Sequence, residues 1–455
     1  MNIHSVYHYI NPFKGGPNTR KLWQFAVEHC RNLTVVIVLS TTMGLTACGG
    51  MPSVRLEVGN RVTQSDGYES FVVAGEPQAA LIAREILLSG GNAVDAAAAL
   101  GFSLAVTLPS SAGLGGGGVC MHYDAAKDKV EVLEFLNSRA PLARPRLARG
   151  LFSLHAKYGY LQWPQVVAPA ENLARFGIPM SRALAHDLEN YGSRLIADRA
   201  TIEIFMTSQK EFLRVGEILK QPLLASTLSN VRSRFSNGLR VDLYEDAVAT
   251  TIAKALSVNE NKVSQSPPPG WSSVDAQSAK NMLLFLYSSE EVLGSGNGVT
   301  SGAFHLSDES SNGITEFIVA DAQGKTVTCA LTMGRPFGLG VMPGTLGFLL
   351  ASEAPGDLAP VSPISIAYLV GRDTKDVALA AISSGSGAMA RVMSVVEDID
   401  QSGNRYMRRK ETQIRERPGI SMAYCELVPP TGRAQCRISA GVSGYGYAAM
   451  VNLEK

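Results

Sequence analysis

The sequence has no excess of charge of either sign and lacks the motifs that mark nucleotide sites. Its 41 Lys and Arg residues are balanced by 40 Asp and Glu residues, which argues against nucleic acid as an obligatory partner. No G-x-G-x-x-G follows a predicted strand, and no G-x-x-x-x-G-K-[ST] occurs. The histidines in the body of the chain have neither metal-ligand nor catalytic-triad spacing: His122, His155, His186 and His305. We therefore expect no metal and no cofactor.

The first 50 residues lack an apolar run that is long enough to span a membrane comfortably, but they have the features of a secretory leader. Arg31 precedes a short apolar stretch that begins at Leu33 and ends in small residues. This order is typical of a signal peptide. Leu45–Cys48 resembles a bacterial lipobox, which would make Cys48 the lipidated first residue of a lipoprotein. An ordinary signal peptide or a short membrane anchor is the alternative.

The position of Cys48 also indicates where the protein resides. No acidic residue directly follows this cysteine, and by analogy with lipoprotein sorting this favours the outer membrane over the inner one. We therefore predict a lipid-anchored protein of the bacterial cell envelope, on the periplasmic face of the outer membrane. The following segment, residues 49–66, is expected to be a polar tether.

Four cysteines remain in the body of the chain. Cys425 and Cys436 flank a turn at Pro429–Gly432 and could form a disulfide across a hairpin in an oxidising compartment. Cys120 and Cys329 lie in apolar strands, where we expect them to act as small buried hydrophobic residues.

A glycine-rich stretch in the first third of the chain is the most informative segment. Asn92 is suited to cap a helix, and Val94–Leu108 supplies a helix of small apolar residues that can lie close to a sheet. Gly115–Gly118 does not suit a helix or a well-packed strand interior. Four consecutive glycines instead predict a backbone that another segment approaches closely. Val119–Tyr123 and Lys129–Leu133 then read as two strands joined by a turn.

This stretch also carries a family resemblance. Gly90–Pro141 contains GGNAVDAA, GLGGGG and a closing Ala-Pro, and it resembles the large-subunit signature of the γ-glutamyltransferase (glutathione hydrolase) family. The resemblance covers about residues 67–455. It continues through later blocks at Tyr158–Ser181, Gln221–Leu228, Pro267–Pro269 and Pro343–Leu350.

The resemblance implies an architecture and a division of the chain. The fold would be α+β, the four-layer αββα sandwich of N-terminal-nucleophile (Ntn) hydrolases. The predicted parts are a leader at 1–48, a tether at 49–66, a large-subunit-like region at 67–313 and a small-subunit-like region at 314–455. The large-subunit-like region is expected to be mainly helical after its opening hairpin.

In the family, the precursor cuts itself before a threonine that opens the small subunit. The freed α-amine then serves as the base for that threonine's hydroxyl. Ile314–Asp321 aligns with this opening strand, so Ile314 occupies the nucleophile position without a hydroxyl. Thr315 is adjacent, but side chains alternate across a strand, and only a one-residue slip would bring Thr315 into place. Thr332 matches a supporting threonine beside the nucleophile.

The positions that would contact substrate are also altered. Asn137 stands where the family has an arginine for the glutamyl α-carboxylate, and a neutral amide cannot make a bidentate charged contact. Arg139 lies two residues further on and is the candidate to compensate. The remaining substrate-binding positions correspond to Gly334, Ser362 and a turn formed by Gly385, Ser386 and Gly387, which retains backbone donors for an oxyanion.

Scaffold motifs are therefore retained where chemistry motifs are lost. This contrast predicts a γ-glutamyltransferase-like protein that is not autoprocessed and that acts as a non-catalytic binding or structural relative. Its ligand would be a small γ-glutamyl or peptide-like molecule. The alternative is an active γ-glutamyl hydrolase or related amidohydrolase that uses Thr315 or Ser386. A third hypothesis is a structural subunit that pairs with an active paralogue.

Overall fold

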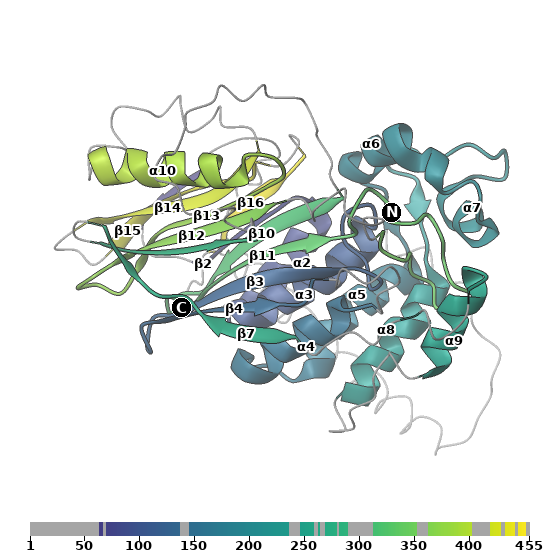
Figure 1. Ribbon diagram of the computed structural model, residues 1–455, viewed down its shortest axis with the longest axis horizontal. Helices are drawn as coiled ribbons and strands as arrows, with labels where there is room; N and C mark the ends of the chain where they lie inside the picture. Colours follow the sequence, from purple (N-terminus) through teal and green to yellow (C-terminus); the bar gives the residue numbers. More distant parts are fainter. Residues whose placement is uncertain are drawn as a thin grey trace, which may run out of the picture. The chain divides into compact units, whose positions relative to one another are not determined.

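Two seven-stranded antiparallel sheets lie face to face, and helices cover their outer faces (Figure 1). The computed structural model describes residues 63–66, 70–136, 145–235, 246–258, 263, 269–279, 282–289, 313–352, 363–402, 419–428, 433–441 and 445–451.

The first sheet carries the glycine-rich segment and the strand that opens with Ile314. Its strand order is β16-β2-β10-β11-β3-β4-β7. The bounds are β2 (Ser70–Ala74), β3 (Gly117–Asp124), β4 (Lys129–Glu134), β7 (Gly270–Ser273), β10 (Ile314–Ala320), β11 (Thr326–Thr332) and β16 (Tyr447–Val451).

The second sheet has the order β1-β15-β14-β13-β12-β9-β8. The bounds are β1 (Thr63–Asp66), β8 (Gln277–Ala279), β9 (Met282–Ser288), β12 (Ile364–Gly371), β13 (Val377–Ser384), β14 (Ile420–Val428) and β15 (Arg433–Ser439). The prediction of a tether at 49–66 missed β1, which pairs with β15. The prediction of a mainly helical large-subunit-like region missed β7, β8 and β9. Strand β7 pairs with β4 and β9 pairs with β12, both far away in the sequence, whereas β8 pairs with the adjacent β9.

Helices form the two outer layers. The bounds are α2 (Pro77–Leu88), α3 (Ala93–Thr107), α4 (Leu147–Tyr158), α5 (Trp163–Phe176), α6 (Arg182–Tyr191), α7 (Arg199–Phe205), α8 (Pro222–Phe235), α9 (Asp246–Ala255) and α10 (Ala388–Ser402). A two-stranded sheet pairs β5 (Ile178–Pro179) with β6 (Ile218–Leu219). Helix α10 covers the second sheet, and α2 and α3 lie against the first. The predicted αββα layering is confirmed. No helix in the described residues is long and apolar enough to cross a membrane.

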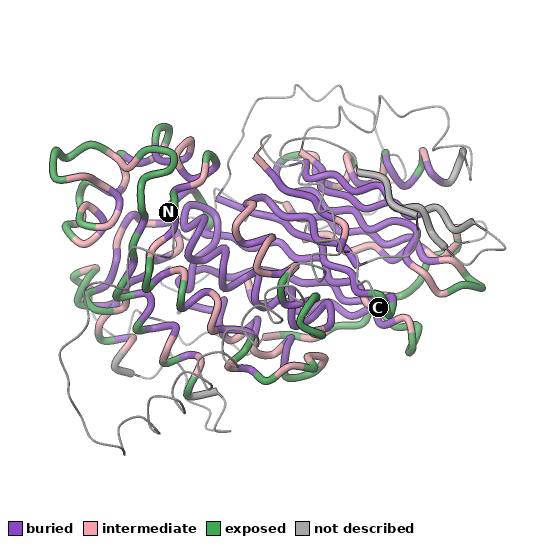
Figure 2. Tube along the Cα trace, turned by 180° about the vertical axis from the view of Figure 1, so that it is seen from behind, coloured by how far each residue is buried: buried purple, intermediate pink, exposed green. Residues whose placement is uncertain are grey.

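The central strands are buried on both faces, as Figure 2 shows. In β10, Ile314 and Ile318 belong to the apolar core between the sheets, whereas Phe317 and Val319 belong to the core under the helices. This alternation follows from the two-residue period of a strand. It explains why the second half of the strand, Phe317–Ala320, is apolar at every position rather than at alternate ones.

The signature around Asn92 is structural. Asn92 caps α3, and Asp95 completes the capping box while also accepting a hydrogen bond from the backbone N–H of Tyr160 at 2.9 Å. Asp321, in the turn after β10, accepts a hydrogen bond from the N–H of Ala93 at 2.9 Å. All residues of α3 are buried, so these carboxylates satisfy donors that water cannot reach. The motif therefore joins the start of α3 to the strand that carries Ile314.

The glycine run is approached closely by other backbone segments, as predicted. A Cβ at Gly115 would lie 2.1 Å from Leu349 O, and one at Gly116 would lie 2.3 Å from Thr332 O. No side chain fits at such distances. The prediction excluded these glycines from a helix or a well-packed strand interior; Gly117 and Gly118 are the first two residues of β3, where they pair with β11.

Two disulfides join neighbouring strands. Cys425 bonds to Cys436 across β14 and β15, which confirms that prediction. Cys120 and Cys329 are buried as expected, but the prediction that they are unpaired was wrong, because they form a disulfide between β3 and β11. They are 209 residues apart in the sequence, and only the sheet brings them opposite each other.

One carboxyl group lies in the core between the sheets. Glu316 is fully buried, and its Oε2 atom has no hydrogen-bond partner among the described residues. Burial raises the pKa of this carboxyl from 4.5 to about 7, although hydrogen bonds with Ser384 and Ser421 and the charge of Arg391 act in the opposite direction. The folded protein therefore favours the neutral form of Glu316.

We predict that Glu316 makes the protein less stable as the pH rises. Because the folded-state pKa is raised, its contribution is complete below pH 4.5 and is lost as the pH rises through about 7. Urea unfolding at pH 5 and pH 8 should show a loss that is about 3 kcal/mol smaller in Glu316→Gln than in the wild type. Glu203→Gln is the control, because that side chain is 63% exposed. An equal loss in the wild type and Glu316→Gln would contradict the prediction.

Candidate functional site

The peptide bond before β10 has an unusual environment. Gly313 has a φ of +66°, and its carbonyl accepts hydrogen bonds from Met333 N at 2.8 Å and from Thr332 Oγ1 at 3.2 Å. Thr332 Oγ1 in turn accepts a hydrogen bond from Gly334 N at 2.9 Å. Two donors aimed at one carbonyl polarise it and would stabilise negative charge on its oxygen.

Ile314 lies directly beside this carbonyl. It is the first residue of β10, it pairs in register with Thr332, and its side chain is buried in the core between the sheets. Its aliphatic side chain offers no atom that could attack a carbonyl or transfer a proton.

Thr315 is on the other face of the sheet. Its hydroxyl is fully buried and has no hydrogen-bond partner within the described residues. A Cβ at Gly75 would lie 2.8 Å from Thr315 Oγ1, so the hydroxyl is directed toward the start of α2. A one-residue slip would break the register of β10 with both β2 and β11.

The turn between β13 and α10 contains the predicted oxyanion donors. Gly385 donates its N–H to Pro363 O at 2.8 Å, whereas the N–H groups of Ser386 and Gly387 have no backbone acceptor in the described part of the chain. Ser386 is exposed. Arg391 holds the turn through hydrogen bonds to the carbonyl oxygens of Ser386 at 2.7 Å and Ser384 at 2.6 Å.

Glu316 connects this turn to β10. It lies two residues after Ile314 on the same face of the strand, and its carboxyl interacts with the hydroxyl of Ser384 at the end of β13. The structure therefore brings Ile314, Thr332 and the Gly385–Gly387 turn to one end of the two packed sheets.

Four predicted site residues lie outside the described residues: Cys48, Asn137, Arg139 and Ser362. Sequence reasoning did not single out Glu316 and Arg391. A charged residue within an apolar strand was the available signal for Glu316. Arg391 gave no comparable signal, because its role depends on the turn into which the chain folds before α10.

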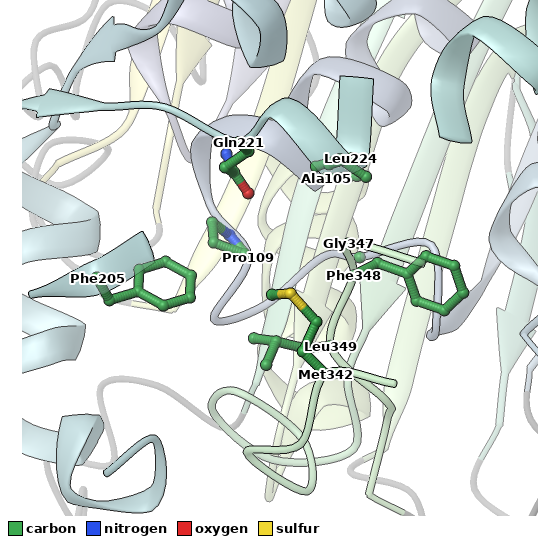
Figure 3. A pocket seen from close by; sticks show the side chains of 10 residues that line it. Ala105, Pro109, Phe205, Gln221, Leu224, Met342, Gly347, Phe348 and Leu349 are labelled. Carbon is green, nitrogen blue, oxygen red and sulfur yellow. The ribbon is translucent and has the colours of Figure 1, made fainter. Parts of the chain in front are cut away.

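No group of three or more His, Cys, Asp or Glu side chains within the described ranges could hold a metal ion. A small pocket lies elsewhere, between the end of α3 and the segment around Met342 (Figure 3). Phe205, Leu224 and Leu349 make it largely apolar, and it has room for about one water molecule. It is too small for a peptide-like ligand.

Comparison with known proteins identifies the sequence relatives. The gamma-glutamyltranspeptidase family profile matches residues 79–146 and 137–265. The glutathione hydrolase proenzyme of Escherichia coli is 27% identical over 232 residues, which cover 46% of this chain and 39% of that protein. Glutathione hydrolase 2 of Arabidopsis thaliana is 31% identical over 185 residues, which cover 36% of this chain and 32% of that protein. The match thus spans about a third of the length of these relatives.

A solved structure supports the fold over most of the chain. The cephalosporin acylase of Bacillus halodurans superposes with a TM-score of 0.62 at 15% identity, covering 88% of this chain and 99% of that one. At this identity the likeness shows a shared fold alone. The family profile and the sequence relatives show that residues 79–265 are similar to the γ-glutamyltranspeptidase family.

Proposed function

We propose that the protein is an unprocessed, non-catalytic γ-glutamyltransferase-like protein that binds a small γ-glutamyl or peptide-like ligand. The observation that carries this proposal is Ile314, which lies beside a polarised Gly313 carbonyl but has no hydroxyl. Self-cleavage requires an oxygen or sulfur nucleophile at this position to attack the preceding carbonyl.

The loss of one side chain would remove two functions. In an N-terminal-nucleophile enzyme, cleavage frees the α-amine that later acts as the base. Without cleavage, the nitrogen of Ile314 stays in an amide bond and cannot accept a proton at neutral pH. The two donors to Gly313 would then stabilise the intact chain rather than an intermediate.

Localisation and assembly form part of the same proposal. The lipobox-like segment ending at Cys48 supports a lipid anchor on the periplasmic face of the outer membrane. The disulfides Cys120–Cys329 and Cys425–Cys436 support an oxidising compartment. Pairing with an active paralogue is a further proposal, which the family resemblance supports.

The first prediction concerns the covalent state of the chain. Protein produced in a bacterial envelope should give one polypeptide by intact-mass measurement, cleaved at the leader and carrying a diacylglycerol-type modification at Cys48. Cys48→Ser is the control for lipidation. Two fragments that divide at Gly313 would contradict the proposal.

A substitution at position 314 can supply the hydroxyl that Ile314 lacks. Ile314→Thr should convert a measurable fraction of the chain into two fragments, because a hydroxyl would then lie beside a carbonyl that already has two donors. Ile314→Val is the control, since it is β-branched but has no hydroxyl. Adding Thr332→Val should slow cleavage by about tenfold or more, because one donor is lost. If Ile314→Thr folds but stays intact, the site lacks more than the nucleophile.

The alternative, an active amidohydrolase, is favoured by one observation: Ser386 is exposed in a turn that has free backbone donors. It predicts turnover of a chromogenic γ-glutamyl anilide that falls at least about a hundredfold in Ser386→Ala. Thr315→Ala tests the other hydroxyl and should have no effect, because Thr315 faces the helices. Absence of turnover at high protein concentration would exclude this alternative.

A further inference from the structure

Two arginine side chains converge on one short loop beside Gly313. Arg194 donates from Nη1 to Pro336 O at 2.9 Å, and Arg335 donates from Nε to Gly338 O at 3.2 Å. Their guanidinium groups are therefore held by carbonyls only two residues apart. This loop, residues 333–340, follows directly from β11.

The two positive charges are not neutralised within the described part of the chain, where neither arginine forms an ion pair with Asp or Glu. Burial and then the charge of Arg335 lower the pKa of Arg194, so the two groups repel each other. Each guanidinium has five N–H donors, and the hydrogen bonds to the loop carbonyls leave donors on both groups. Two nearby positive charges without an acidic partner favour the binding of an anion.

The backbone that positions these arginines is strained. Phe337 has a φ of +61°, which is a rare conformation for a bulky side chain. It is held by a hydrogen bond from its N–H to Ser110 O at 2.9 Å and by burial of its ring against Phe205. Such strain persists only where the surroundings enforce it, and it is often found at ligand-binding sites.

The loop also adjoins the candidate site. The backbone of Arg335 lies against Gly313, since a Cβ at Gly313 would be 2.6 Å from the Cα of Arg335. Gly334 and Arg335 are exposed, and Arg194 is half-buried. A small molecule next to Gly313 could therefore reach the exposed side of this loop.

We propose that Arg194 and Arg335 form an oxyanion-binding site for a carboxylate or a phosphate group of a small ligand. Planar guanidinium groups match the paired oxygens of both anions. The proposal rests on the proposed binding function and names residues that could supply the charge missing at Asn137.

Calorimetric titration of the full chain with L-glutamate and with inorganic phosphate tests the site and separates the two anions. We expect one of the two anions to bind to the wild type. Arg335→Gln should raise the Kd of that anion at least tenfold, and the double variant Arg194→Gln/Arg335→Gln should show no measurable binding. Arg335→Lys should recover part of the affinity, because it keeps the charge but loses the fork. Arg199→Gln is the matched control, since Arg199 is 91% exposed and pairs with Glu203.

Thermal unfolding of each variant shows whether it folds. The substitutions at Arg335 are the least expected to disturb the core, because Arg335 is exposed. If the wild type binds neither anion, the oxyanion site is overturned, while intact mass still reports the unprocessed state independently. If binding is unchanged in Arg335→Gln and in the double variant, the ligand site lies elsewhere and the assignment of these arginines is overturned.

Discussion

The register of β10 in the first sheet determines the geometry on which the candidate site depends. Pairing with β2 and β11 places Ile314 opposite Thr332 and directs Glu316 into the core between the sheets. It also ends the strand where Asp321 can cap the start of α3. Strands β2 and β11 on either side of β10 enforce this register. A one-residue slip that placed Thr315 at the position of Ile314 would therefore disturb every buried side chain of the strand.

The motifs around Asn92 and in the glycine run have structural roles that do not depend on catalysis. Asn92 and Asp95 satisfy buried backbone donors, and the glycine run admits the backbones of Thr332 and Leu349 at distances that no side chain allows. Replacing them would cost stability whatever the protein does. Ile314 carries no such structural demand for a hydroxyl, since an apolar side chain suits the core between the sheets.

The charged side chains near the candidate site fall into two groups with different surroundings. Glu316 is buried between the sheets, and burial raises the pKa of its carboxyl to about 7. Arg391 donates hydrogen bonds that hold the turn before α10. By contrast, Arg194 and Arg335 converge without an acidic partner among the described residues. Burying a charge is costly, so Glu316 is where a proton would have the largest effect, whereas the two arginines are where an anionic ligand would.

The sequence by itself determined the local elements and the family resemblance. The capped helix after Asn92 and the hairpin beginning at Ile314 follow from local propensity and periodicity, so both could be predicted. Tertiary structure alone decided the Cys120–Cys329 disulfide, the strand at Thr63–Asp66 and the environment of Glu316. These features depend on contacts between segments that lie far apart in the chain. A local sequence pattern does not specify which distant strand will pair with a given strand.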